Sequence, residues 1–219
     1  MKIRLNKNIL TKEKKIALNN PEYVKIENKK YKINTDFRVA IKCNNIALDN
    51  SIGEYEKSLA IIYKLFGDEG LKDFDNHEKL LELGQRYLRL DKDYENNYEE
   101  PDMDFVQDKQ YIRSSFMQDY KYNPYDLEYL HWWDFYHDLN GLSNSEFGNC
   151  CILNRIRNLR TYDISQIKDT KEKERIIKTK KQVALNRTKG SLTKKEQESV
   201  RKFFESMKRA WCLWIMMGG

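Results

Sequence analysis

Apolar side chains recur three and four residues apart along most of this chain, and that spacing constrains its fold more than any other feature. In one C-terminal stretch, Val200, Phe203, Phe204, Met207 and Trp211 follow it. An α-helix has about 3.6 residues per turn, so side chains at this spacing share one face, and that face needs a partner to cover it. Only about ten residues alternate as they do in a half-buried strand. We therefore predict a mainly α-helical fold, with about seven helices in one compact domain and a small N-terminal β-hairpin.

The hairpin is predicted at residues 23–33. Its residues alternate about Val24 and Ile26, with a turn near Asn28. Thr35 or Asp36 can cap the helix that follows. The glycines at 67 and 141 favour helix ends. The predicted helices cover residues 37–46, 53–66, 76–90, 105–120, 125–140, 143–160, 165–185 and 194–216.

The chain divides into a polar N-terminal arm (1–21), a helical domain (22–185) and an amphipathic aromatic C-terminal helix (193–217). Residues 91–104 interrupt the domain with seven acidic residues, one proline and little periodicity, which indicates an exposed acidic loop. That loop lacks the ligand spacing and turn glycine of an EF-hand, so we expect no metal there. We expect no cofactor elsewhere.

The location expected for this protein is the cytosol. The longest apolar run, residues 210–217, is eight residues long, too short to cross a bilayer. The N-terminus lacks the apolar core of a signal peptide. Cys43, Cys150, Cys151 and Cys212 form no CxxC pair. Buried, reduced thiols in a reducing compartment are the favoured interpretation.

Positive charge is concentrated in residues 168–209, which hold 15 Lys and Arg against six Asp and Glu, in a chain whose net charge is +6. Such an excess attracts acidic protein surfaces or nucleic acid. The charges alternate in sign, which favours a solvated helix face. Binding to an acidic protein and binding to nucleic acid remain as alternatives.

Catalytic motifs are sparse. We find no GxGxxG, P-loop, HExxH or GxSxG pattern. His131, Asp134 and Asp138 would share one helix face and could hold a metal or act as acid and base. They lie in an aromatic helix, so packing is the favoured interpretation, and we expect the protein not to be an enzyme.

A second polar face is predicted at residues 154–160, where Arg155, Arg157 and Arg160 accompany two asparagines. Arginines can bind a carboxylate or another anion bidentately. Intramolecular ion pairs on a solvated face are the favoured alternative.

The C-terminal helix has the strongest amphipathic pattern. Its aromatic face could pack on its own domain or dock into a partner, and each large ring would bury about 150–250 Å². We predict that partner binding uses this face together with the tryptophan pair of an earlier helix. The residues are Phe203, Phe204, Met207, Trp211, Trp214, Ile215, Trp132 and Trp133.

Several short motifs resemble one phage protein family. They are YKINTDFR (31–38), FVQDKQYIRSSFMQDY (105–120), LHWWDF (130–135) and LNGL (139–142), with weaker matches at FG (147–148), RIR (155–157) and IKD (167–169). In order and rough spacing, over about residues 22–185, the chain resembles the bacteriophage gene-product-fifteen family. The aromatic C-terminal helix is not part of the motif set.

This resemblance implies a tail-assembly chaperone of tailed phages, encoded just before the tape-measure protein. Such a protein binds the tape-measure protein and tail-tube subunits, and it is absent from the mature virion. Association with itself or with a companion chaperone is a further expectation. The resemblance implies no catalytic residues. The alternative function is a nucleic-acid-binding phage accessory protein that uses the basic 168–209 segment.

Overall fold

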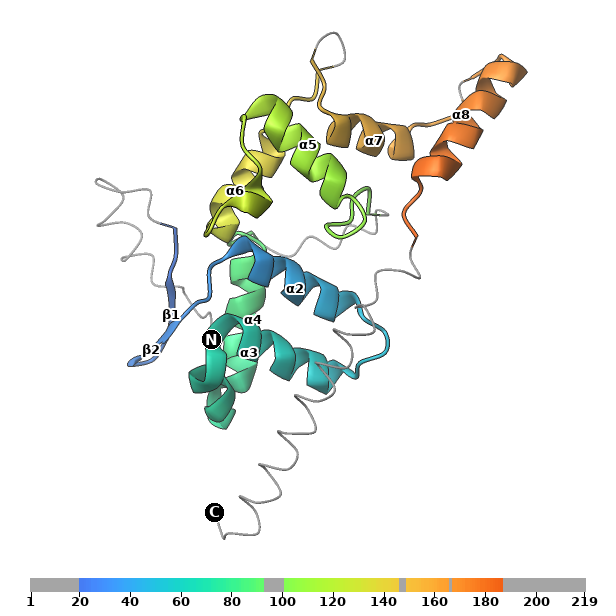
Figure 1. The fold of residues 1–219 in the computed structure, drawn as a ribbon. Coiled ribbons are helices and arrows are strands. Elements are labelled where there is room, and N and C mark those ends of the chain that lie inside the picture. The colour runs from blue at the N-terminus through green and yellow to red at the C-terminus, as the bar shows by residue number, and fades with distance from the viewer. Residues whose placement is uncertain (1–19, 93–100, 146–148, 166, 187–219) are drawn as a thin grey trace.

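The computed structural model describes residues 20–92, 101–145, 149–165 and 167–186 (Figure 1). Within these ranges a two-stranded β-hairpin precedes seven α-helices and two short 3-10 helices. The predicted fold class, mainly α with a small N-terminal hairpin, is confirmed. No helix in the described part of the chain is long and apolar enough to span a bilayer.

The hairpin joins β1 (Tyr23–Ile26) to β2 (Lys29–Lys32) in antiparallel register, with Tyr23 opposite Lys32. The turn between the strands contains Glu27, whose φ is 54°. Side chains alternate across a strand, so one face of the hairpin is buried and the other is solvated. The buried face packs on the helical core, which supplies the support that an isolated hairpin lacks.

Three helices form the half of the molecule next to the hairpin: α2 (Phe37–Leu48), α3 (Glu54–Lys72) and α4 (His77–Leu88). As predicted, Asp36 caps α2, because its carboxylate accepts a hydrogen bond from the Arg38 backbone N–H. A 3-10 helix (Phe74–Asn76) links α3 to α4. Gly67 has φ +65° and ψ −158°, so the helix breaks at Gly67 as predicted, and a second helical segment continues α3 beyond this kink to Lys72.

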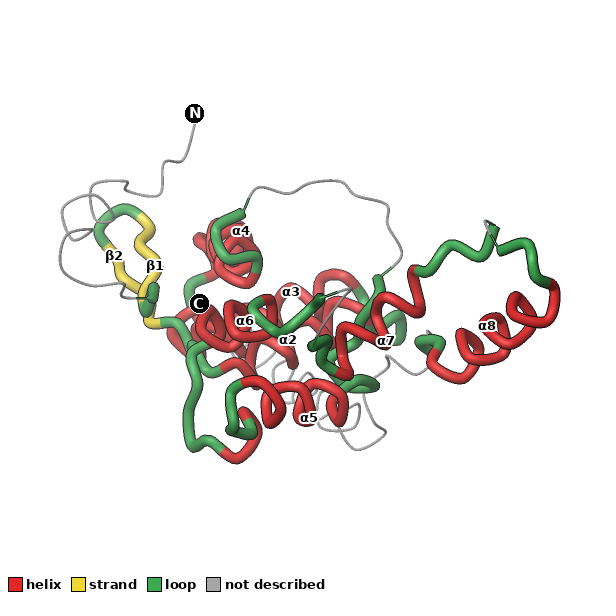
Figure 2. Tube along the Cα trace, turned by 90° about the horizontal axis from the view of Figure 1, so that it is seen from above, coloured by secondary structure: helices red, strands yellow, loops and turns green. Residues whose placement is uncertain are grey.

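The other half contains α5 (Lys109–Asp119), α6 (Trp132–Asn140), α7 (Ile152–Thr161) and α8 (Thr170–Val183). Figure 2 shows α8 extending outward beyond α7. Stacked rings hold the two halves together. Phe37 of α2 lies 4.4 Å from Phe135 of α6, centroid to centroid, and Phe116 of α5 lies 5.5 Å from Phe135. All three side chains are fully buried.

Helix α6 begins later than the sequence predicted. The predicted helix covered 125–140, but only a 3-10 helix (Pro124–Asp126) forms before an extended stretch. The extended stretch pairs with the segment before α2. The Phe37 N–H donates to the Leu130 carbonyl at 3.0 Å, and the Trp132 N–H donates to the Thr35 carbonyl at 2.8 Å. These long-range bonds use backbone groups that a continuous helix would need.

Helix α7 also begins later than predicted, at Ile152 rather than after a Ser143 cap. The Ser143 carbonyl instead accepts from the Cys151 N–H at 3.0 Å and from the Asn154 side chain at 3.2 Å. Cys151 therefore occupies the N-cap position of α7. The helix predicted at 105–120 likewise begins only at Lys109.

Candidate protein-interaction surface

Trp132 and Trp133 fasten α6 to the end of α4. The Trp132 indole N–H donates to the Leu88 carbonyl, and that of Trp133 donates to the Tyr87 carbonyl, each at 3.0 Å. Both acceptors lie in the last turn of α4, where carbonyls lack intrahelical partners. The Trp133 ring also stacks on Tyr87, and Trp132 is only 5% exposed. Trp132 therefore lies in the core of its own chain and offers no free surface for the partner contact predicted for it, while Trp133 is half-buried.

The side chains of His131, Asp134 and Asp138 use separate partners. His131 is the N-cap of α6, and its Nδ1 accepts from the Trp133 backbone N–H at 3.0 Å. Asp134 accepts from the Asn20 amide at 2.7 Å, and Asp138 accepts from the Tyr122 hydroxyl. Burial lowers the pKa of His131, which favours the neutral form of the ring. No cluster of three potential metal ligands occurs among the described residues.

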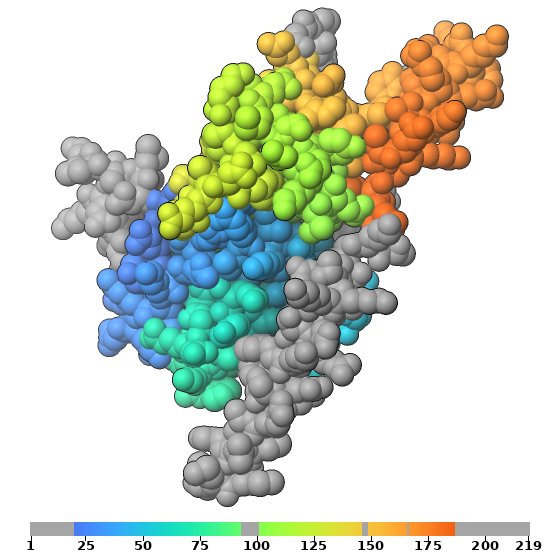
Figure 3. All heavy atoms as spheres, in the orientation of Figure 1, coloured from blue at the N-terminus to red at the C-terminus, as the bar shows by residue number. Residues whose placement is uncertain are grey.

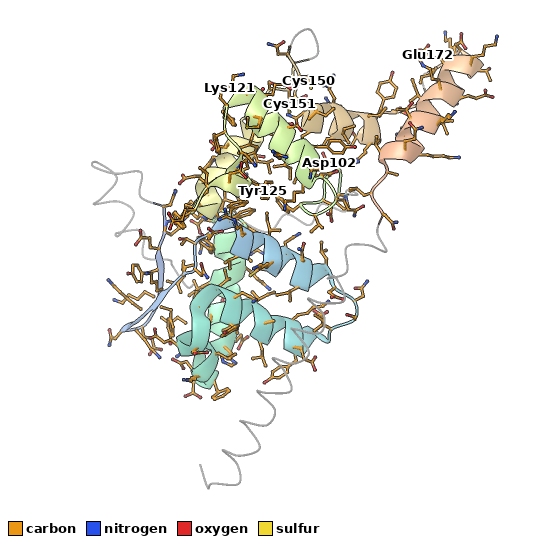
Figure 4. All side chains as sticks on the ribbon, in the orientation of Figure 1. Asp102, Lys121, Tyr125, Cys150, Cys151 and Glu172 are labelled. Carbon is orange, nitrogen blue, oxygen red and sulfur yellow. The ribbon has the colours of Figure 1, made fainter. Side chains whose placement is uncertain are left out.

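The arginines of α7 bind carboxylates within the chain. Arg157 pairs with Asp102, which is labelled in Figure 4, and the two charged groups lie 2.9 Å apart. Arg160 donates to both carboxylate oxygens of Asp108, each at 2.7 Å. The sequence left two alternatives for this face, binding of an external anion and intramolecular ion pairs. Arg157 and Arg160 form intramolecular ion pairs, whereas Arg155 is exposed. The sequence marked the arginines but gave no signal for their partners, which lie more than 50 positions earlier.

Arg160 also holds the base of α8. Its Nε donates to the Val183 carbonyl at 2.7 Å, in the last turn of that helix. Beside it, Gln107 and Asn186 exchange two hydrogen bonds at 2.8 and 3.1 Å. At the other end of α8, Asp169 caps the helix by accepting from two backbone N–H groups. The C-terminal end of α8 is therefore attached to the body.

Along its length α8 has no buried residue, unlike the other six described α-helices. Figure 3 shows it standing out from the body, and Glu172, labelled in Figure 4, lies near its outer end. Ile176, Ile177 and Val183 are only partly covered. The remaining surface is rich in lysine and arginine, so α8 presents apolar groups beside positive charge. We call α8 the projecting arm.

The other predicted partner-binding residues, Phe203, Phe204, Met207, Trp211, Trp214 and Ile215, lie outside the described residues, as do parts of the acidic loop. Their roles stay predictions. The projecting arm is not among the partner-binding residues predicted from the sequence, because its alternating charges are typical of a solvated helix face.

These features define a mainly α-helical protein whose least covered described helix is a positively charged arm. A family model described as Bacteriophage Gp15 protein matches residues 18–185, a range that includes the hairpin and every described helix. The chain therefore belongs to the bacteriophage Gp15 family and is a phage protein, in agreement with the resemblance seen in its motifs. No curated protein and no solved structure matches it.

Proposed function

We propose that this protein is a non-catalytic tail-assembly chaperone that binds the tape-measure protein and tail-tube subunits during tail morphogenesis. It acts in the host cytoplasm and leaves the tail before the virion is complete. Family membership over residues 18–185 carries the proposal, through the role that the resemblance implies. Two features of the chain support it physically.

The first is the projecting arm. A chaperone must hold a partner reversibly, so its binding surface needs apolar groups that stay partly in water and are not sealed in a core. Ile176 and Ile177 meet this condition. The lysines around them guide the encounter with an acidic partner more than they add affinity. A long helical partner could dock its own apolar stripe against this arm.

The second is the amphipathic pattern of residues 193–217. Its aromatic face, from Phe203 to Ile215, follows the arm in sequence and supplies further apolar contact area in the proposal. Together the arm and this segment would offer two binding stretches in the C-terminal part of the sequence. Two linked weak contacts bind more tightly than either alone, while each contact remains individually reversible.

Co-expression with the tape-measure protein of the same phage tests the proposal. The full chain is expected to keep the tape-measure protein in the soluble fraction and to co-purify with it. The variant Ile176→Asp with Ile177→Asp should reduce the captured amount about tenfold, which corresponds to about 1.4 kcal/mol. Met117→Asp, at an exposed apolar position on α5, is the control and should capture the normal amount. Failure of the unaltered chain to bind or solubilise any tail protein would contradict the proposal.

A nucleic-acid-binding accessory protein is the second candidate, because the arm exposes several lysines. Phosphate contacts release counterions, so such binding weakens steeply as salt increases. Retention on DNA or RNA at low salt, lost after Lys171→Glu and Lys178→Glu, would support this candidate. Absence of retention at any salt concentration would eliminate it.

A further inference from the structure

One side of α8 carries exposed cations for which the described residues provide no ionic partner. They are Lys171, Arg175, Lys178 and Lys181. None of them belongs to an ion pair in the part of the chain that the structure describes. At 100° per residue these four positions fall within one side of the helix, and Glu174 is the acidic residue among them. This side of the arm is therefore a basic surface.

A surface of opposite charge surrounds the connection between α3 and α4. Five exposed carboxylates gather there, and none pairs with a cation among the described residues: Asp68, Glu69, Asp75, Glu78 and Glu82. Of the two exposed lysines in the same stretch, Lys79 is already engaged by Glu27 at 3.6 Å. The connection is therefore a net acidic surface.

The two surfaces match in spacing as well as in sign. Lys171 and Arg175 lie one helical turn apart on α8, and Glu78 and Glu82 lie one turn apart on α4. Each pair is separated by about 6 Å along its helix axis. Two helices laid side by side could therefore bring both cations opposite both carboxylates.

The surfaces cannot meet within one molecule, because they lie at opposite ends of it. Figures 1 and 2, seen from perpendicular directions, both place α8 at one side of the body, away from α3 and α4. We propose that the basic side of α8 docks against the acidic α3–α4 surface of a second copy of this chain. The two surfaces differ, so the contact is head-to-tail, and repetition gives either a closed ring or an open filament.

This self-association does not depend on the tape-measure protein, so it can fail while the proposed chaperone function stands, and the reverse also holds. The contact consists of exposed charges on helices, so it should be weak and sensitive to salt. Sedimentation velocity of the nuclease-treated full chain is the test. The sedimentation coefficient should increase with protein concentration at low salt. That increase should vanish at about 1 M salt, where the Debye length is about 3 Å.

Charge reversal identifies the surfaces. The basic-reversed variant carries Lys171→Glu, Arg175→Glu and Lys178→Glu, and the acidic-reversed variant carries Asp75→Lys, Glu78→Lys and Glu82→Lys. Each variant alone should remain monomeric at concentrations where the unaltered chain associates. An equal mixture of the two should associate again, because each restores an opposite-charge contact with the other. Basic reversal lowers the formal net charge from +6 to 0. Net repulsion therefore cannot explain its loss of association.

Reversal of three exposed lysines elsewhere, Lys25→Glu, Lys32→Glu and Lys42→Glu, makes the same change in net charge and should leave association intact. Circular dichroism establishes that each variant keeps its helices. The proposal is overturned if the unaltered chain is monomeric at every concentration. It is also overturned if association persists in the two reversed variants, if their mixture stays monomeric, or if association requires added nucleic acid.

Discussion

Arg160 joins three parts of the chain that are distant in sequence. Its guanidinium binds Asp108 bidentately and also donates to the Asp102 carbonyl at 2.8 Å and to the Val183 carbonyl. The Asp108 side chain is 1% exposed and that of Arg160 is 10% exposed, so both charges have been removed from water. Desolvation of this kind is tolerable only while each charge has its partner.

Replacing Arg160 should therefore destabilise the protein strongly. Arg160→Met leaves the Asp108 carboxylate buried without its cation, and we expect the free energy of unfolding to decrease by about 3–5 kcal/mol. The double variant Arg160→Met with Asp108→Leu removes both charges and should recover part of that loss. Urea denaturation measures both variants. If Arg160→Met decreases the free energy of unfolding by less than about 1 kcal/mol, the Arg160–Asp108 pair does not hold these parts of the chain together as described.

Asp73 ties the hairpin to the end of α3. Its carboxylate accepts from Lys29 at 2.8 Å, from the Tyr31 hydroxyl and from Asn76 at 3.0 Å. The hydrogen bond from Lys29, followed by that from Tyr31, lowers the pKa of Asp73 from 3.8 to about 2. The folded state thus holds the carboxylate ionised at pH values where the unfolded chain takes up a proton.

The resulting stabilisation should be present above about pH 4 and should be lost as the pH falls from about 4 towards 2. Melting temperatures recorded across this range should decrease, and Asp73→Asn should make the decrease shallower because it removes the titrating group. An identical pH profile for the two proteins would contradict the role given to Asp73.

At the scale of elements, local signals were sufficient for some features and not for others. The hairpin and the Asp36 cap depend on neighbours in the sequence, and both were predicted correctly. The starts of α6 and α7 depend on backbone bonds to residues 35, 37 and 143, which no local pattern reveals. Dense aromatics at Trp132 and Trp133 could indicate core or partner surface equally well. In the structure both indole N–H groups donate to carbonyls of α4, so the two side chains pack against their own chain.

Gly67 is a local signal that predicts a helix break but not the segment that follows it. Its φ of +65° and ψ of −158° are values that glycine alone adopts readily. The helix break predicted there occurs, but no local pattern predicted that a second helical segment follows it to Lys72. Gly67→Ala should decrease the free energy of unfolding by about 1–3 kcal/mol, entirely through backbone strain. A Cβ at this position would meet nothing within 4 Å.

Thermal or urea unfolding measures this cost. Asp68→Ala, at the exposed neighbouring position, is the control and should change stability by no more than about 0.5 kcal/mol. Equal stability of Gly67→Ala and the unaltered protein would mean that the kink is not an obligatory feature of α3.

At the scale of the whole molecule, the chain combines a well-packed body with a helix that the body hardly covers. Aromatic stacking around Phe135 and the buried Arg160–Asp108 pair fix the body, whereas α8 is held mainly through its C-terminal end. The helical class and the family could be predicted from the sequence, because periodicity and motifs are properties of the sequence itself. The direction in which α8 points could not, because it is set by Arg160 and by the Gln107–Asn186 bonds.

Hydrogen–deuterium exchange of the full chain, with and without the purified tape-measure protein, tests the central proposal most directly. Binding through the projecting arm should slow exchange of the amides between Thr170 and Val183, and the amides buried around Phe116 and Phe135 should exchange as before. The sample without tape-measure protein is measured at the same chain concentration, so any protection caused by self-association is present in both samples. Unchanged exchange across α8 and across residues 193–217 at saturating tape-measure protein would contradict the account.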